Sequence, residues 1–212
     1  MHTLASCHDD GWKRTANRDM LPNDPTTPAR KQLLHRYLND LPQGSRVLDY
    51  GCGRGEFTDY LATLGFRVAG VDLSALAIEF NRRDFPALEF VQLEQDHVPL
   101  PDQSFDAIWC SEVIEHVYDV HAIFAEFARL LRVGGRLILT TPYHGWLKNL
   151  LVITFGFDRH FDVEWPHIRF WTKRSLTKIA GAHGLKPVTW DSVGRIPCLA
   201  KSFFVVFERR AD

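Results

Sequence analysis

The sequence feature that constrains the fold most is a glycine-rich segment between two apolar runs. The first run leads through Asp49 into GCGRG at 51–55, and the second run, 67–71, ends on Asp72. Glycine has no Cβ, so such a loop lets the backbone turn tightly and approach a ligand closely. An acid at the tip of the next strand is where a doubly wound sheet holds a ribose diol. The segment therefore predicts a strand, a loop, a helix and a second strand, with a ligand site at the loop.

The spacing of the pattern departs from the dinucleotide-binding fingerprint. It reads D-x-G-C-G-x-G, so that Asp49 stands before the first glycine. A carboxylate there would repel a pyrophosphate, but it suits a ligand with a cationic amine. S-adenosylmethionine carries an ammonium, a sulfonium and a ribose, and it has no phosphate. The residues therefore favour S-adenosylmethionine over NAD.

Strand and helix patterns alternate along the rest of the chain. We expect strands at 46–50, 67–71, 88–93, 107–110, 136–140, 186–190 and 203–208, and helices at 28–40, 56–64, 74–82, 120–131 and 175–183. This alternation implies a parallel sheet with helices on both faces, and the last two strands are expected to form an antiparallel edge hairpin. Residues 142–170 break the rhythm and are interpreted as an inserted cap.

The ordered motifs resemble those of a known family. After the glycine loop and Asp72 come Ser104-Phe105-Asp106 and Gly134-Gly135, and over about 46–141 the chain is similar to class I S-adenosylmethionine-dependent methyltransferases. The resemblance implies a Rossmann-like α/β fold with a seven-stranded, mostly parallel sheet, an antiparallel edge hairpin and a small cap insertion. We expect an N-terminal arm at 1–26 and a methyltransferase domain at 27–212, with the cap at 142–170.

The same resemblance implies which residues hold the cofactor. Asp49 would bind the methionine end, directly or through water, and the amides of Gly51 and Gly53 would line the same crevice. Asp72 would accept both ribose hydroxyls in a charge-assisted bidentate contact. Leu73 would lie against the adenine.

Two further positions complete the expected cofactor site. The family often places an acid near the adenine amine just after the third strand, where Glu94 falls, with Asp96 as a nearby alternative. Ser111, at the end of the fourth strand, is also assigned to the cofactor.

A second group of polar residues follows the fourth strand. If the segment turns helically, Glu112 faces Glu115 and His116, and His167 is a fourth candidate from the cap. E-x-x-E-H with a distant histidine resembles two subfamilies, the small-RNA 3′-terminal 2′-O-methyltransferases and the catechol O-methyltransferases of ubiquinone synthesis. In both, the matching positions bind a divalent cation, so Mg²⁺, Mn²⁺ or Zn²⁺ is implied here. Many class I methyltransferases instead carry E-x-x-x-H without a metal, with the histidine lining the substrate pocket.

The expected catalytic residues belong to the same region. His116 and Glu112 are candidates, and His144, just after the fifth strand, is the candidate base that deprotonates the acceptor hydroxyl. His160 is an alternative base or ligand. In a rival interpretation His116 acts alone as the base and no metal is needed.

The leading function is O-methylation of a small molecule with adjacent oxygens, such as a catechol-like ring or a sugar. An RNA 3′ end is the alternative acceptor, but the net charge of −1 and the lack of a basic run give no strong nucleic-acid signal. A non-catalytic regulatory module that binds the cofactor is a third interpretation. The apolar residues of the cap indicate a lid over the acceptor, with weak membrane contact as a further expectation.

The remaining composition bounds the setting of the protein. No apolar run reaches transmembrane length. The four cysteines show no CxxC pairing, which is typical of reduced thiols in a cytoplasmic protein. The oligomeric state is left open by the sequence.

Overall fold

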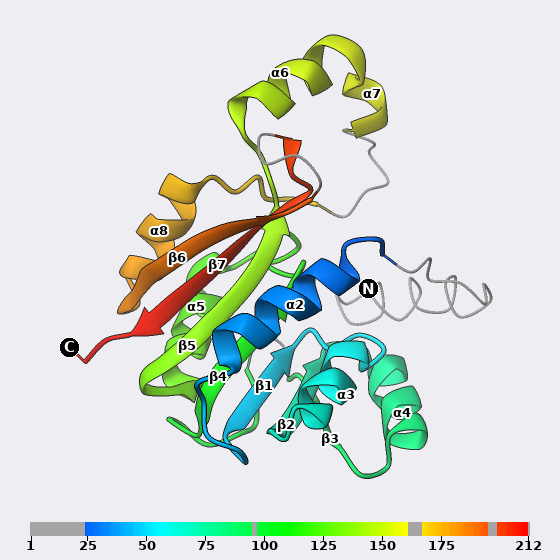
Figure 1. Cartoon of the computed structure of the whole chain (residues 1–212), viewed down its shortest axis with the longest axis vertical. Coiled ribbons are helices and arrows are strands. Elements are labelled where there is room, and N and C mark those ends of the chain that lie inside the picture. Colours follow the sequence, from blue (N-terminus) through cyan, green and yellow to red (C-terminus); the bar gives the residue numbers. More distant parts are fainter. Residues whose placement is uncertain (1–23, 95–96, 161–166, 195–198, 212) are drawn as a thin grey trace.

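The computed structural model describes residues 24–94, 97–160, 167–194 and 199–211, and within these residues one sheet is flanked by helices on both faces (Figure 1). Its strands are β1 Arg46–Tyr50, β2 Arg67–Asp72, β3 Glu89–Gln92, β4 Phe105–Ser111, β5 Leu131–Pro142, β6 Leu185–Val193 and β7 Ser202–Arg209. The helices are α2 Thr27–Leu38, α3 Glu56–Thr63, α4 Ala75–Asp84, α5 Val120–Leu130, α6 Trp146–Phe155, α7 Phe157–His160 and α8 Lys173–Gly181. The expected α/β class is confirmed.

The sheet has the strand order β3-β2-β1-β4-β5-β7-β6. The first five of these strands are parallel, β7 is antiparallel to β5, and β6 is antiparallel to β7. The mostly parallel sheet with an antiparallel hairpin at one edge is therefore confirmed. Because β1 pairs with both β2 and β4, the chain order reverses there, and a crevice at the carboxyl ends of these strands is where open sheets bind ligands.

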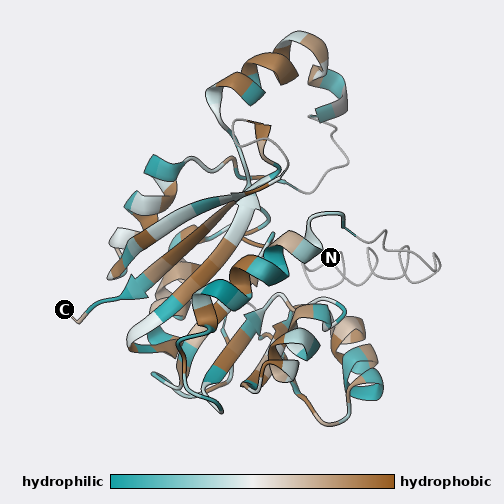
Figure 2. Ribbon diagram, viewed as in Figure 1, coloured by the Kyte–Doolittle hydropathy of each residue, from teal (hydrophilic) through white to brown (hydrophobic). Residues whose placement is uncertain are grey.

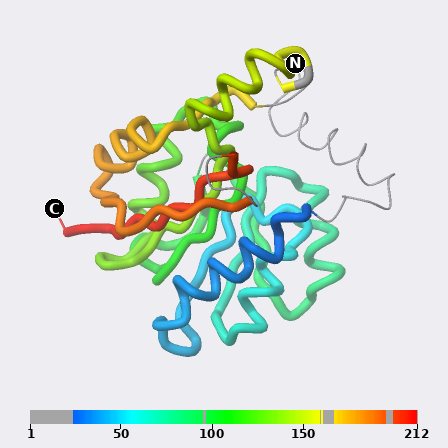
Figure 3. The backbone as a smooth tube through the Cα atoms, turned by 45° about the horizontal axis from the view of Figure 1, so that its top comes forward, coloured from blue at the N-terminus to red at the C-terminus, as the bar shows by residue number. Residues whose placement is uncertain are grey.

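Alternating side chains of β1 divide the core into two layers. Val47 packs in a cluster with Leu34 of α2 and Leu61 of α3. Leu48 packs in a second cluster with Phe124 of α5. The view in Figure 3 shows α2 on the other side of the sheet from α5 and α8. Burial of each such side chain stabilises the fold by roughly 1.5–3 kcal/mol, so these layers fix the sheet that carries the loops.

The junction of α5 and β5 differs from the expectation. We expected the helix to run to Leu131 and the strand to begin at Arg136, after the Gly134-Gly135 pair. Instead α5 ends at Leu130 and β5 begins at Leu131, because the backbone of Leu131 pairs with Phe105 of β4. The glycines lie within the strand, near a register shift between β4 and β5.

The segment interpreted as a cap contains α6 and α7, which project beyond the body of the sheet in Figure 1. No residue of α6 is buried, although the helix is largely apolar, as Figure 2 shows. Among the described residues, every helix is too short or too polar to cross a bilayer. The expected arm at 1–26 lies outside the described residues except for its last three, and residues 161–166 of the cap also lie outside them.

Candidate active site

The glycine loop joins β1 to α3 at the carboxyl edge of the sheet. Gly51 and Gly53 have φ values of 75° and 52°, in the left-handed region that favours glycine. A Cβ on Gly51 would lie 2.4 Å from Cγ2 of Val113, so no larger residue fits without a shift. The amide of Gly51 donates to the carbonyl oxygen of Val71 (2.8 Å), and that of Gly53 donates to Asp72. Both amides therefore donate hydrogen bonds within the protein. These two residues contribute the tight turn of the loop and not free N–H donors.

Asp72 is held by backbone amides on both carboxylate oxygens. Oδ2 accepts from the amide of Gly53 and Oδ1 accepts from the amide of Ser74, each at 2.9 Å. Ser74 also caps α4 by accepting from the amide of Ala77. These two bonds fix the orientation of the carboxylate at the end of β2.

Asp49 is buried at the end of β1, where its Oδ2 accepts a 2.6 Å hydrogen bond from Oγ1 of Thr58. Burial raises the pKa of Asp49 to about 7, and the charge of Asp72 adds to the rise, while the hydrogen bond from Thr58 opposes it. A cationic partner would stabilise the ionised form of this buried carboxyl group.

The residues expected at the adenine lie where β2 and β3 end. The amide of Leu93 donates to the carbonyl oxygen of Asp72 at 2.9 Å, which brings the chain after β3 beside Leu73. Leu73 is half-buried against the core. Glu94 is exposed and forms an isolated antiparallel bridge with His97. Its alternative, Asp96, lies outside the described residues.

Arg30 is a candidate site residue that our sequence analysis missed. Its guanidinium is buried at the carboxyl end of β4, where Nη1 donates to Oγ of Ser111 at 2.8 Å, and Oγ of Ser111 lies 2.9 Å from Oγ1 of Thr140. Nη2 forms an ion pair with Asp24, and Nε is buried with no hydrogen-bond partner among the described residues. A sequence signal existed, because Arg30 falls on the buried stripe of α2 that also contains Leu34.

The segment after β4 does not turn helically, so the condition under which Glu112 would face Glu115 and His116 is not met. Glu112 has φ 54°, a left-handed conformation that ends the strand and prevents a helix from starting there. Glu112 therefore lies outside the ligand group that includes Glu115 and His116. Its Oε1 is nevertheless buried, with no hydrogen-bond partner in the described part of the chain.

Three of the four expected metal ligands do come together. One ligand atom from each of Glu115, His116 and His167 lies within 4.8 Å of the other two. The amides of Ile168 and Arg169 both donate to the carbonyl oxygen of Glu115, at 2.9 and 3.1 Å, which places His167 beside its partners. The ring centroids of His116 and His167 are 4.8 Å apart.

The electrostatics of this group suit a cation. Oε2 of Glu115 accepts a 3.1 Å hydrogen bond from Thr141, and its Oε1 is buried without a partner among the described residues. Burial raises the pKa of Glu115 to about 8, and the charge of Glu112 adds to it. Burial lowers the pKa of His167 to about 4, and the charge of His116 acts in the same direction. A neutral imidazole is the form that binds metal.

The two candidate bases both belong to the cap segment, and His160 is the last residue of α7. His144 follows β5, and its ring centroid is 6.1 Å from that of His160 and 5.2 Å from that of Phe170. Burial lowers the pKa of both His144 and His160. The lowered pKa favours the neutral form of both imidazoles.

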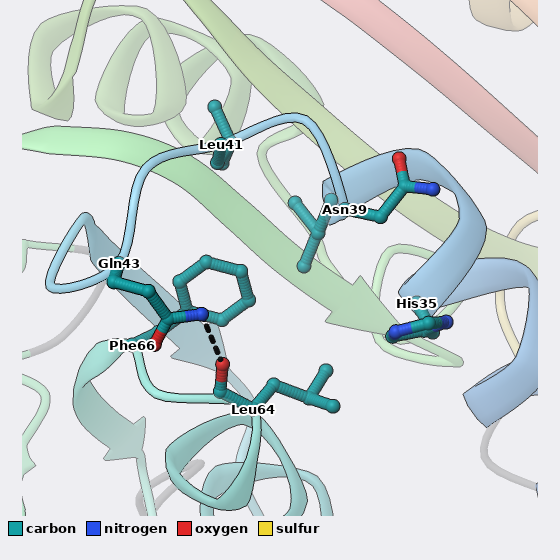
Figure 4. A pocket seen from close by; sticks show the side chains of 7 residues that line it. His35, Asn39, Leu41, Gln43, Leu64 and Phe66 are labelled. Carbon is teal, nitrogen blue, oxygen red and sulfur yellow. Dashed lines mark hydrogen bonds between the residues drawn. The ribbon is translucent and has the colours of Figure 1, made fainter.

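A small cavity of about 110 Å³ lies at the other end of the sheet (Figure 4). Its lining includes Gln43, Leu64 and Phe66, which precede the amino ends of β1 and β2, and Nε2 of Gln43 donates to the carbonyl oxygen of Leu64 at 3.2 Å. None of the expected site residues lines it, so we assign it no part in the site.

The doubly wound sheet, the glycine loop after β1 and the oriented acid at the end of β2 together define a class I S-adenosylmethionine-dependent methyltransferase. The chain belongs to the methyltransferase domain family, which matches residues 25–189.

Relatives of known name agree with this placement. Over 150 residues the chain is 34% identical to a probable S-adenosylmethionine-dependent methyltransferase of Mycobacterium tuberculosis, with 71% of this chain and 52% of that protein covered. Over 103 residues it is 39% identical to a ubiquinone biosynthesis O-methyltransferase of Xanthomonas oryzae pv. oryzae, with 46% and 43% covered. The chain thus spans about half the length of the curated relatives it matches.

Among solved structures, the geranyl diphosphate C-methyltransferase of Streptomyces coelicolor A3(2), in complex with Mg²⁺, geranyl diphosphate and S-adenosyl-L-homocysteine, is similar to this chain. The TM-score is 0.69 at 20% identity, with 86% of this chain and 79% of that chain covered. At this identity the similarity establishes the fold, and the particular acceptor is a separate question.

Proposed function

We propose that the chain transfers a methyl group from S-adenosylmethionine to a hydroxyl of a small molecule with adjacent oxygens, such as a catechol-like ring or a sugar, assisted by a divalent cation. The observation that supports this most is the gathering of Glu115, His116 and His167. Glu115 and His116 follow the carboxyl end of β4, on the segment whose Val113 lies against Gly51 of the glycine loop. Adjacent oxygens suit such a group, because one cation binds both at once.

The residues present fit a cation. The Oε1 atoms of Glu115 and Glu112 are buried acceptors that have no partner among the described residues, and burying a carboxylate without a partner is costly. Two imidazoles and a carboxylate form a donor set that suits Zn²⁺ or Mn²⁺ better than Mg²⁺, which prefers oxygen alone. A cation bound here would lower the pKa of the acceptor hydroxyl.

The cofactor would lie across the ends of β1, β2 and β4. Asp72 would accept the ribose hydroxyls, because both of its oxygens are already oriented. Asp49 would face the ammonium of the methionine end. Arg30 would face its carboxylate through Nε, which has no partner in the part of the chain that the structure describes. A zwitterion is thereby matched by one buried acid and one buried base.

The adenine would lie toward the end of β3. Leu73 offers an apolar surface for the ring, and Glu94 would accept from the adenine amine. Ser111 would act on the cofactor indirectly, because its hydroxyl contacts the Arg30 guanidinium.

Methyl transfer is an in-line displacement, so holding the acceptor oxygen against the sulfonium supplies much of the rate. His144 would take the hydroxyl proton, since burial keeps its imidazole neutral. The acceptor would enter below the cap, where Phe170 lies beside His144. The cap would exclude water from the sulfonium.

The outer face of the cap supports a further part of the proposal. Trp146, Ile153 and Phe155 are 78%, 61% and 82% exposed, although such side chains are normally covered. The α6 segment has no acidic residue, and Lys148 is its single charge. These properties suit weak contact with a lipid surface, in addition to the role of the cap as a lid.

The proposal is tested with radiolabelled S-adenosylmethionine and matched acceptors. Catechol and 3,4-dihydroxybenzoate are compared with phenol and 4-hydroxybenzoate, which lack the adjacent oxygen, and with a short RNA. We expect methylation of the diols in preference to their monohydroxyl analogues. Equal rates for phenol and catechol would contradict the role of adjacent oxygens, and methylation of the RNA alone would make the RNA end the acceptor.

A further inference from the structure

Asp24 lies between two cations that come from different parts of the chain. Its Oδ2 forms an ion pair with Nη2 of Arg30 and accepts a 2.7 Å bond from Nζ of Lys201. Its Oδ1 accepts from the amide and the hydroxyl of Thr26, at 3.0 and 2.7 Å. These contacts fix the carboxylate just before α2. We call Arg30, Asp24 and Lys201 the Asp24 bridge.

One end of the Asp24 bridge lies in the cofactor region. The side chain of Arg30 is 8% exposed, and Nη1 bonds to Ser111 at the end of β4. Its Nε is the buried donor that has no partner among the described residues. The guanidinium is thus anchored on two sides, by Ser111 and Asp24, and its Nε–H is a buried donor that could meet an anion.

The other end of the Asp24 bridge holds the cap. The carbonyl oxygen of Lys201 accepts from the amide of Tyr143 at 2.9 Å and from Nζ of Lys148 at 3.4 Å. The same Nζ contacts the carbonyl oxygen of Ala200 at 3.2 Å. Lys148 belongs to α6, so the backbone beside Lys201 is an anchor of the cap helix on the body of the protein.

We infer that Asp24 and Lys201 are positioning residues that couple occupation of the cofactor site to the order of α6. The inference rests on the proposed function, in which the methionine carboxylate meets Arg30. Two carboxylates on one guanidinium repel each other, and Lys201 offsets that repulsion because it also contacts Asp24. Lys201 is therefore held more firmly when the cofactor is bound, and the carbonyl oxygens that anchor Lys148 are held with it.

This coupling implies that the cofactor binds before the acceptor. When the cofactor is absent, the contacts that anchor α6 are weaker and the acceptor site beside the cap is less ordered. When the cofactor binds before the acceptor, it orders the cap and completes the acceptor site. This order also protects the sulfonium, because the lid is fixed only over a loaded site.

The test is hydrogen exchange of residues 146–155, read by mass spectrometry with and without saturating S-adenosylhomocysteine. Lys201→Met keeps most of the side-chain stem and leaves the Arg30–Asp24 pair in place. Lys31→Met is the matched control, since Lys31 lies next to Arg30 on α2 and makes an exposed ion pair with Glu56. We expect the wild type and Lys31→Met to exchange about two- to fivefold more slowly with the ligand, the size expected of one partly exposed ion pair.

In Lys201→Met we expect most of this ligand-dependent slowing to disappear, while affinity for S-adenosylhomocysteine falls by no more than about fivefold. Asp24→Asn should lower the affinity as well, because it releases Arg30. The inference alone would be overturned if the ligand slowed hydrogen exchange in Lys201→Met as much as in the wild type. It would also be overturned if the ligand bound to the wild type without slowing exchange. A wild type that does not bind the ligand would overturn the proposed function and the inference together.

Discussion

The imidazoles of His116 and His167 lie with their ring centroids 4.8 Å apart, which brings the loop after β4 against the segment that returns from the cap. The backbone amides of Ile168 and Arg169 donate hydrogen bonds to the carbonyl oxygen of Glu115 and maintain this contact. Nε1 of Trp171 also donates to the carbonyl oxygen of Ile114 at 3.3 Å. These contacts fix the segment at 167–171 against the loop after β4, where we propose that the acceptor binds.

Asp72→Ala should weaken the binding of S-adenosylhomocysteine. The ribose hydroxyls lose a charged acceptor worth roughly 1.5–3 kcal/mol, which corresponds to about a 10- to 100-fold loss of affinity. Titration calorimetry measures this directly. Asp84→Ala is the control, because Asp84 is an exposed acid at the end of α4 that pairs with Arg83. Unchanged affinity in Asp72→Ala would remove the ribose assignment.

Affinity for S-adenosylhomocysteine should depend on pH through Asp49. Its folded-state pKa is raised to about 7, so the ligand-free protein loses stability as pH rises from about 4 to about 7, where the buried carboxyl ionises. Ligand binding needs the ionised form to meet the ammonium, so affinity should fall as pH drops below about 7. Calorimetry across this range should show that the affinity of the wild type depends on pH and that the affinity of Asp49→Asn does not. An identical slope in the variant would show that another group titrates.

Gly51→Ala should destabilise the fold as well as disturb the loop. The new Cβ would meet Val113 at 2.4 Å, and the φ of 75° is unfavourable for alanine. We expect a loss of about 1–3 kcal/mol of unfolding free energy, measured by urea denaturation. Gly181→Ala is the contrasting variant, because no atom lies within 4 Å of its added Cβ. Equal stability of the two variants would contradict the steric account of the loop.

The pattern of the sequence predicted most of the framework, because apolar periodicity and glycine positions are local signals. The strands from β1 to β5, the loop at Gly51 and the cap on α4 at Ser74 follow from such signals. The left-handed turn at Glu112 did not, because a non-glycine residue in that conformation is fixed by its surroundings. The site role of Arg30 also depends on tertiary structure, since its partner Ser111 is distant in sequence.

The outer face of the cap should bind lipid vesicles weakly. Replacing both Trp146 and Phe155 with serine removes the two most exposed aromatic side chains of α6. Co-sedimentation with vesicles that contain anionic lipid should fall in this variant, while binding of S-adenosylhomocysteine stays the same. Val133→Ser is the control, because Val133 is an exposed apolar residue outside the cap. Equal sedimentation of the wild type and the cap variant would leave α6 with the lid role alone.

The central claim is that Glu115, His116 and His167 hold a divalent cation that methyl transfer needs and cofactor binding does not. The most direct measurement is methyl transfer to catechol by one preparation with and without excess chelator, with the metal content and the S-adenosylhomocysteine affinity of that preparation determined alongside. We predict that chelation and His167→Ala each abolish transfer, that His183→Ala does not, and that the affinity is nearly unchanged throughout. Full turnover in excess chelator by a protein that contains no metal would contradict the claim and leave His116 to act alone as the base.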